Sequence, residues 1–191
     1  MSFQAKMFNR RAADPKYQPD RILEVLALQK GQVVADIGSG GGYFSFRFAR
    51  AVGHQGRIYA LDTNVSMLEY VHRSAAEQGF DNIETRLIDA DDLPLPENAL
   101  DVVFLRNVCH HLPDRRVYFS KIKQLLKLDG KVAIIEYKPG VGLFRRLFQH
   151  YVPLQTIIQE MHEAGYQIHA SFDFLPDQSF TIFIADTSLV T

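Results

Sequence analysis

Short apolar runs alternate with amphipathic segments along most of the chain, and this alternation limits the fold more than any other feature. The runs are rich in valine and isoleucine and are bounded by Gly, Asp or Pro, as in strands buried on both faces of a parallel sheet. A repeating order of strand and helix predicts a doubly wound α/β sheet with right-handed crossovers. Strands are expected at 33–37, 57–62, 83–89, 101–105 and 131–137, and helices at 19–29, 43–52, 66–78, 114–128 and 153–164, with Gly31, Gly53, Gly79, Gly130 and Gly165 ending them.

The end of the chain departs from this pattern. Two strand-like runs, 166–174 and 179–186, are joined only by the short link "LPDQ". A link of this length cannot cross over to make a parallel pair, so the two runs must form an antiparallel hairpin. We therefore expect a single domain over 1–191 with a seven-stranded mixed sheet that is parallel except for an antiparallel last strand. The segment 1–30 is expected to form a helical leader before this sheet.

The composition is that of an ordinary globular protein. A formal net charge of −1 over 191 residues provides no field that would attract nucleic acid or an anionic membrane surface. Cys109 is the only cysteine, so an intramolecular disulfide is impossible and a reducing compartment fits. The first residues lack an apolar signal segment, and no apolar run is long enough to span a bilayer. These features predict a cytoplasmic protein that binds neither nucleic acid nor a membrane stably.

The first expected strand runs directly into a glycine-rich loop, "VVADIGSGGGYFS" at 33–45. Glycines permit sharp turns and the close approach of a ligand, and a loop between strand and helix presents free backbone N–H groups. The dinucleotide fingerprint G-x-G-x-x-G needs a third glycine at the position of Tyr43, so the spacing does not match. The loop therefore indicates a ligand site that differs from the usual dinucleotide site.

Two carboxylates accompany this loop. Asp36 lies inside the strand two residues before Gly38, and Asp62 closes the next strand. Asp36 would repel a diphosphate and attract a cation, and a carboxylate at Asp62 can accept hydrogen bonds from both ribose hydroxyls of a nucleoside. The pair favours a positively charged adenosine derivative. S-adenosylmethionine has the sulfonium, the ammonium and the ribose that such a site would bind.

With these motifs the sequence resembles the class I, Rossmann-like S-adenosylmethionine-dependent methyltransferases, in the small-molecule branch that includes the ubiquinone/menaquinone C-methyltransferases. The resemblance runs from about Pro19 to Tyr137, and the terminal hairpin matches the reversed final strand of that family. It implies a complete set of cofactor-binding positions. The loop and amino-group residues are Asp36, Gly38, Ser39, Gly40 and Gly42; the ribose and adenine residues are Asp62, Thr63, Met67, Asp89 and Ala90; the residues of the methionine end are Arg106 and Asn107.

Methyl transfer from a sulfonium is an in-line displacement, so alignment of the acceptor in a dry pocket supplies most of the acceleration. A general base is needed only where the acceptor loses a proton. The candidates are His110 and His111, which follow the fourth strand at the ligand-binding edge of the sheet. Adjacent side chains point in different directions, so at most one is expected to face the acceptor, and a structural role in the following turn is the alternative. No third ligand at metal-binding spacing is present, and Cys109 is expected to be a small buried residue.

Two segments are candidates for substrate specificity. Apolar side chains at helical spacing in 138–152 indicate a short lid over an apolar acceptor, a dimer contact or a helix on a membrane surface, and a helix that simply packs on the sheet is the alternative. The leader at 1–30 is either a cap over the cofactor or an exposed terminus. We expect an enzyme that methylates a small apolar molecule. A protein that binds S-adenosylmethionine without turnover and an NAD(P)-dependent oxidoreductase are the alternatives.

Overall fold

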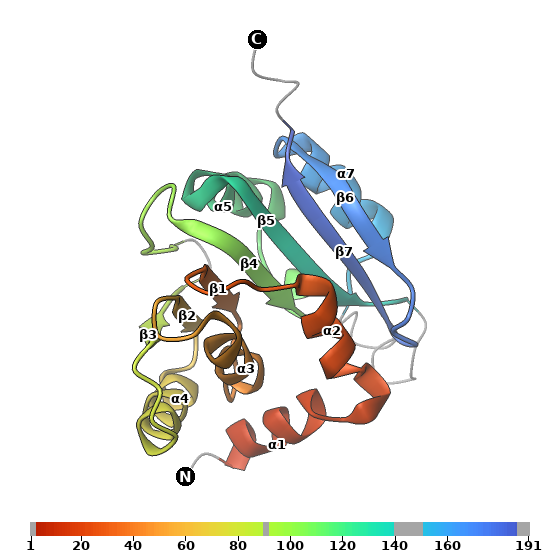
Figure 1. The fold of residues 1–191 in the computed structure, drawn as a ribbon. Helices are drawn as coiled ribbons and strands as arrows, with labels where there is room; N and C mark the ends of the chain where they lie inside the picture. Colours follow the sequence, from red (N-terminus) through yellow and green to blue (C-terminus); the bar gives the residue numbers. More distant parts are fainter. Residues whose placement is uncertain (1–2, 90–91, 140–150, 187–191) are drawn as a thin grey trace. The chain divides into compact units, whose positions relative to one another are not determined.

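The computed structural model describes residues 3–89, 92–139 and 151–186, which divide into two compact units, 1–94 and 95–191 (Figure 1). The first unit contains α1 (Phe3–Ala12), the 3-10 helix η1 (Pro15–Tyr17), α2 (Pro19–Leu26), β1 (Val33–Ile37), α3 (Tyr43–Val52), β2 (Arg57–Asp62), α4 (Val65–Glu77) and β3 (Ile83–Leu87). The second contains β4 (Leu100–Arg106), the 3-10 helix η2 (Cys109–His111), α5 (Arg115–Leu125), β5 (Leu126–Tyr137), α7 (Leu154–Glu163), β6 (Tyr166–Phe172) and β7 (Gln178–Ala185).

The strands of the described residues form a seven-stranded sheet in the order β3-β2-β1-β4-β5-β7-β6. β2 runs parallel to β1 and β3, and β4 runs parallel to β5. β7 runs antiparallel to both β5 and β6. The predicted fold class, a doubly wound α/β sheet with a reversed last strand in a terminal hairpin, is therefore confirmed.

In the first unit, α3 and α4 pack on the same face of the strands (Figure 1). Phe46 of α3 and Val71 of α4 meet over Ala60 of β2 in one buried cluster. The strand β1 is buried from Val34 to Ile37, as its uninterrupted apolar pattern predicts, although Asp36 lies inside this buried run. Burial of each large apolar side chain stabilises the unit by roughly 1.5–3 kcal/mol, so the carboxyl end of β1 has a rigid support.

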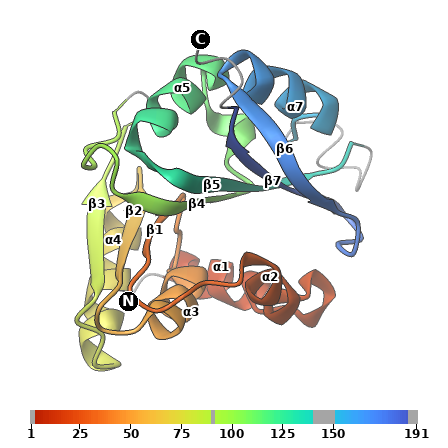
Figure 2. The same ribbon diagram turned by 45° about the horizontal axis from the view of Figure 1, so that its top comes forward.

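In the second unit, α5 and α7 lie on the same face of the strands (Figure 2). They are joined by Arg115, whose guanidinium donates two hydrogen bonds of 2.6 and 2.8 Å to the Glu160 carboxylate. The bonds to Glu160 raise the pKa of Arg115, against the opposing effect of its partial burial. A bidentate pair of this kind fixes the two helices in register, and with them the loop that precedes α5.

Two predicted helix ends are wrong. The sequence predicts that α5 continues to residue 128, with Gly130 beyond its end, but the helix ends at Leu125 and β5 begins at Leu126. Leu126 pairs with Leu100, and a side chain at Gly130 would lie 2.8 Å from the Leu100 carbonyl oxygen, so this glycine allows two strands to approach at a register shift. α2 ends at Leu26, three residues early, because Ala27 adopts a left-handed conformation with φ of 48°.

Candidate active site

The glycine-rich loop between β1 and α3 is held by backbone hydrogen bonds. The N–H groups of Gly38 and Ser39 donate to the Leu61 carbonyl at 2.8 and 2.9 Å, and Gly42 N–H donates to the Ser39 carbonyl at 2.9 Å. Gly38, Gly40 and Gly42 have φ of 70°, 53° and 81°. These angles lie in the left-handed region that other L-residues rarely adopt, so the alternate glycines are required by the turn itself.

Asp62, one of the predicted cofactor residues, accepts hydrogen bonds from two neighbouring segments. Its Oδ2 accepts a 2.8 Å hydrogen bond from Gly40 N–H of the loop, and its Oδ1 accepts one of 2.9 Å from Asn64 N–H. The carboxylate therefore connects the loop to the turn that begins α4. Each oxygen of an ionised carboxylate has a further lone pair, so these two bonds leave capacity to accept from two ribose hydroxyls.

Asp36 is a buried carboxylate, with 4% of its surface exposed. Its Oδ2 accepts a hydrogen bond of 2.5 Å from the Ser45 hydroxyl of α3. Ser39 of the loop has a buried hydroxyl oxygen that has no hydrogen-bond partner among the described residues. Buried polar atoms are nearly always paired, so the Ser39 hydroxyl is available to a ligand or a water molecule in this loop.

The residues predicted for the adenine side of the site are Thr63, Met67, Asp89 and Ala90. Asp89 follows β3 directly, and the Ile88 N–H donates to the Asp62 carbonyl at 3.1 Å, which brings the ends of β2 and β3 together. The Asp89 side chain is exposed and accepts a 3.0 Å hydrogen bond from Asp92 N–H. Thr63 is exposed and Met67 is buried. Ala90 lies outside the described residues.

Sequence reasoning missed Asn9, which links α1 to the loop. Its side-chain amide donates a 2.7 Å hydrogen bond to the Gly41 carbonyl, and its Oδ1 accepts one of 3.2 Å from Tyr43 N–H. Gly42, at the N-cap of α3, has no side chain to cap this helix, so Asn9 provides the missing acceptor from another part of the chain.

A glycine is needed at position 41 for a different reason from the other glycines of the loop. A side chain at Gly41 would overlap with the Ala5 carbonyl and the Asn9 amide of α1. The side chain of Phe8, also on α1, lies 3.4 Å from the position that a Cβ of Gly40 would occupy. The loop is therefore short of side chains partly because a helix packs on it. This packing favours the interpretation of the leader as a cap.

In the second unit, Asn107 is strained at the end of β4. Its φ is 58°, its N–H donates to the Ile135 carbonyl at 2.8 Å, and its Oδ1 accepts a 2.6 Å bond from the Gln178 amide of β7. Asparagine tolerates this left-handed conformation better than most residues. Gln178 is fully buried, and its own Oε1 has no partner among the described residues. Arg106, the last residue of β4, is half-buried beside Asn107.

The two histidines occupy different environments in η2. The His110 side chain is 7% exposed, and its Nδ1 lies 3.1 Å from Oε1 of Glu136, which is fully buried near the end of β5. His111 is exposed. The two rings nevertheless lie close, with centroids 4.1 Å apart and planes at 47°. His110 thus lies in contact with a buried carboxylate.

Cys109 is fully buried, as predicted from the sequence. Burial raises the pKa of its thiol well above the ordinary value, and the nearby carboxylate of Glu136 raises it further. The thiol therefore stays protonated and cannot act as a nucleophile.

This burial predicts the reactivity of the thiol. In the native protein, Cys109 is expected to resist a thiol reagent such as Ellman's reagent, and one thiol per chain is expected to react once the protein is unfolded in guanidinium chloride. Because the chain has a single cysteine, the absorbance change is read without correction. Rapid labelling of the native protein would contradict the buried position.

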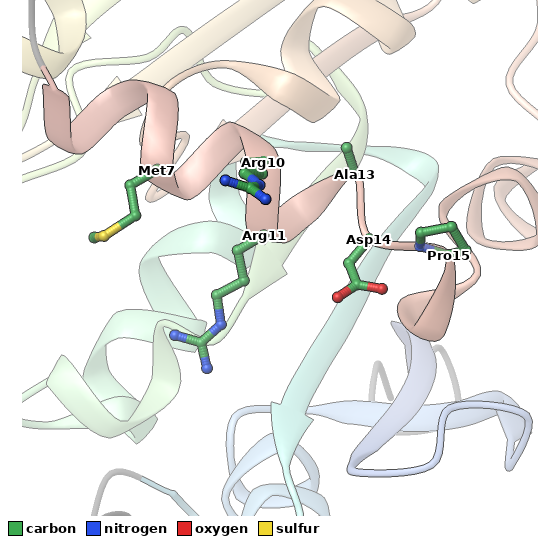
Figure 3. Close-up of a pocket in the computed structure, with 6 residues that line it drawn as sticks. All are labelled: Met7, Arg10, Arg11, Ala13, Asp14 and Pro15. Atoms are coloured by element: carbon green, nitrogen blue, oxygen red, sulfur yellow. The ribbon is translucent and has the colours of Figure 1, made fainter.

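Four other observations concern the candidate residues and their surroundings. An open hollow of about 590 Å³ at the end of α1 is lined by Met7, Arg10, Arg11, Ala13, Asp14 and Pro15, and none of the predicted cofactor residues lines it (Figure 3). Within 3–89, 92–139 and 151–186, no three His, Cys, Asp or Glu side chains gather as metal ligands would, and no helix combines the length and apolar character needed to cross a bilayer. Most of the predicted lid at 138–152 lies outside the described residues.

Comparison with known proteins assigns these residues to a family. The family model described as a methyltransferase domain matches residues 28–177. The chain belongs to this methyltransferase family. The resemblance to class I S-adenosylmethionine-dependent methyltransferases inferred from the loop and the acidic strand ends is thereby confirmed.

Individual relatives agree with this assignment. The chain is 28% identical to the ubiquinone/menaquinone biosynthesis C-methyltransferase UbiE of Teredinibacter turnerae over 131 residues, which cover 68% of this chain and 53% of the relative. It therefore spans about half the length of that relative. A crystal structure of a SAM-dependent methyltransferase from Aquifex aeolicus is similar, with a TM-score of 0.82 at 20% identity over 95% of this chain and 98% of that one.

A second solved structure shares the fold. Geranyl diphosphate C-methyltransferase from Streptomyces coelicolor A3(2), in complex with Mg²⁺, geranyl diphosphate and S-adenosyl-L-homocysteine, has a TM-score of 0.71. Its identity is 17%, and the match covers 87% of this chain and 77% of that one. At such low identities both structures show a common fold and no more.

Proposed function

We propose that this chain transfers a methyl group from S-adenosylmethionine to a small apolar molecule. The observation that carries the proposal is the bond from Gly40 N–H to Asp62, which places a carboxylate against the glycine loop. A carboxylate in this position suits the ribose hydroxyls of a nucleoside. The second carboxylate, Asp36, is buried in β1 and opposes the diphosphate of a dinucleotide.

The residues of the first unit fit the cofactor. Asp62 has lone pairs left for the ribose hydroxyls, and the Ser39 hydroxyl is a buried polar atom with no partner among the described residues. The buried Asp36 supplies negative charge for the ammonium group, directly or through water. The cofactor supplies an electrophilic methyl group on a sulfonium with a neutral leaving group. Gly38 and Gly40 let the chain pass close to it, and Arg106 and Asn107 are proposed to line its methionine end.

The acceptor is proposed to be a small apolar molecule that is methylated on carbon, oxygen or nitrogen. The family and the name of the Teredinibacter turnerae relative, a C-methyltransferase of quinone biosynthesis, support an acceptor of this kind. A homodimer and a location in the cytoplasm remain predictions, the latter from the single cysteine.

Calorimetry with three ligands tests the cofactor. S-adenosylhomocysteine is expected to bind with a Kd in the micromolar range, about −8 kcal/mol, while NAD⁺ and NADP⁺ give no heat at the same concentrations. Binding of NAD⁺ alone would favour the oxidoreductase alternative. Release of S-adenosylhomocysteine in a screen of phenols, hydroquinones and amines separates an enzyme from a protein that only binds the cofactor.

A further inference from the structure

Glu136 is a carboxylate at a position where the chain should be apolar. It lies near the carboxyl end of β5, and the residues from Val132 to Tyr137 around it are all buried. Its own exposed fraction is 0%. Burying a carboxylate costs several kcal/mol unless it is well hydrogen-bonded, so a leucine here would serve the fold better. A glutamate at this position is therefore expected to have a role other than stabilising the fold.

The hydrogen bonds of Glu136 define what it can do. Its Oε1 accepts a 2.9 Å hydrogen bond from the Tyr137 N–H, and it lies 3.1 Å from Nδ1 of His110. Its Oε2 is buried without a hydrogen-bond partner in the part of the chain that the structure describes. Arg115 of α5 gives both of its short bonds to Glu160 instead. Within the residues that the structure describes, the side chain that hydrogen-bonds to the Glu136 carboxyl group is the His110 ring.

This contact determines which nitrogen of His110 has the hydrogen. Oε1 already accepts from the Tyr137 N–H, so it is an acceptor oxygen of the carboxyl group, and Nδ1 is the donor in this contact. In a neutral imidazole with hydrogen on Nδ1, the other nitrogen, Nε2, has a lone pair and is a proton acceptor. Free histidine prefers the opposite arrangement, so the glutamate selects the form of the ring whose Nε2 can act as a base.

We propose that Glu136 is a positioning residue that holds His110 with its hydrogen on Nδ1, so that Nε2 takes a proton from the methyl acceptor. The proposal rests on the proposed methyltransferase function and deepens it. It assigns the acceptor to molecules that lose a proton on methylation, such as hydroquinones and other phenols. The acceptor's proton passes to Nε2, its electron pair forms the bond to the methyl carbon, and the pair of the broken carbon–sulfur bond leaves with the thioether.

The chain contains a matched control for this pair. His54 Nδ1 lies 2.8 Å from Asp81 Oδ1, which repeats the contact between histidine and carboxylate, but these side chains are 80% and 67% exposed. Glu136→Gln keeps the size of the side chain and an oxygen that can accept from Tyr137 and His110, and it removes the charge. Asp81→Asn makes the same change at the surface, at a residue with no role in the proposed site.

The first test is spectroscopic and needs neither substrate nor cofactor. Long-range ¹H–¹⁵N NMR of histidine-labelled protein at mildly alkaline pH distinguishes the two neutral forms of the ring, and His110→Gln identifies the signal among the seven histidines. His110 is expected with hydrogen on Nδ1 and a bare Nε2 in the wild type. A signal with hydrogen on Nε2 would overturn the proposal even if every variant were active.

The second test measures turnover with 1,4-naphthohydroquinone as the acceptor. Glu136→Gln is expected to lower kcat at least about tenfold with unchanged binding of S-adenosylhomocysteine, and Asp81→Asn to leave kcat unchanged. Equal kcat in the two variants would reduce Glu136 to a structural role. If the wild type binds S-adenosylhomocysteine and does not methylate the hydroquinone, the inferred acceptor class is wrong. If it does not bind S-adenosylhomocysteine at all, the proposed function itself fails.

Discussion

Replacing Asp62 with asparagine is expected to weaken binding of S-adenosylmethionine by about ten- to a hundredfold. The carboxylate accepts from Gly40 N–H and Asn64 N–H in the protein and is proposed to accept from the ribose hydroxyls as well. An amide has a single oxygen, so it cannot replace all of these bonds, and the stranded donors cost about 1–3 kcal/mol. Titration calorimetry of the purified variant measures this loss directly.

Asp62→Asn can weaken binding in two ways, by loss of the bonds to the ligand and by destabilising the loop, because Asp62 also accepts from Gly40 N–H. Thermal unfolding of the unliganded variant measures the loss of stability, and calorimetry measures the combined effect on affinity. Asp129→Asn, an exposed aspartate on β5, is the control and is expected to keep the wild-type affinity. Unchanged affinity in Asp62→Asn would remove this residue from the cofactor site, whatever its effect on stability.

The fold could be predicted because the strongest signals in this sequence are local. β1 and β2 begin and end where their apolar runs do, and the "LPDQ" link is too short for anything other than the hairpin of β6 and β7. The prediction failed where local signals disagree with tertiary pairing. The helical spacing continues through Leu126, but pairing of this residue with Leu100 starts β5 at once.

The carboxylates of the candidate site could be predicted from the sequence, but the residues that hydrogen-bond to the glycine loop and to Asn107 could not. Asp36 and Asp62 stand out because a charged residue interrupts or closes an apolar run. Glu136 interrupts β5 in the same way and could have been found by the same signal. Asn9 and Gln178 had no such signal, because their partners lie 32 and 71 residues away along the chain and only the folded structure brings them together.

Adding one methyl group at Gly41 is expected to detach α1 from the glycine loop. The Cβ of Gly41→Ala would overlap with the Ala5 carbonyl and the Asn9 amide, which belong to the helix backbone and to a side chain held by two hydrogen bonds. Overpacking of this kind costs about 1–3 kcal/mol, and the helix can escape the overlap by moving away. Hydrogen–deuterium exchange should then show lost protection across residues 3–12, together with weaker binding of S-adenosylhomocysteine.

Gly79→Ala distinguishes this packing effect from ordinary strain at a glycine. Gly79 has φ of 73°, and no atom lies within 4 Å of the position that a Cβ would occupy, so alanine there costs about 1–2 kcal/mol of backbone strain and touches nothing. Both variants should lose stability, but only Gly41→Ala should expose α1. Asn9→Ala is expected to reproduce part of this exposure, since it removes the cap of α3 and leaves Gly41 intact. If α1 stays protected in Gly41→Ala, the helix does not pack on the loop in solution, and the leader is no part of the cofactor site.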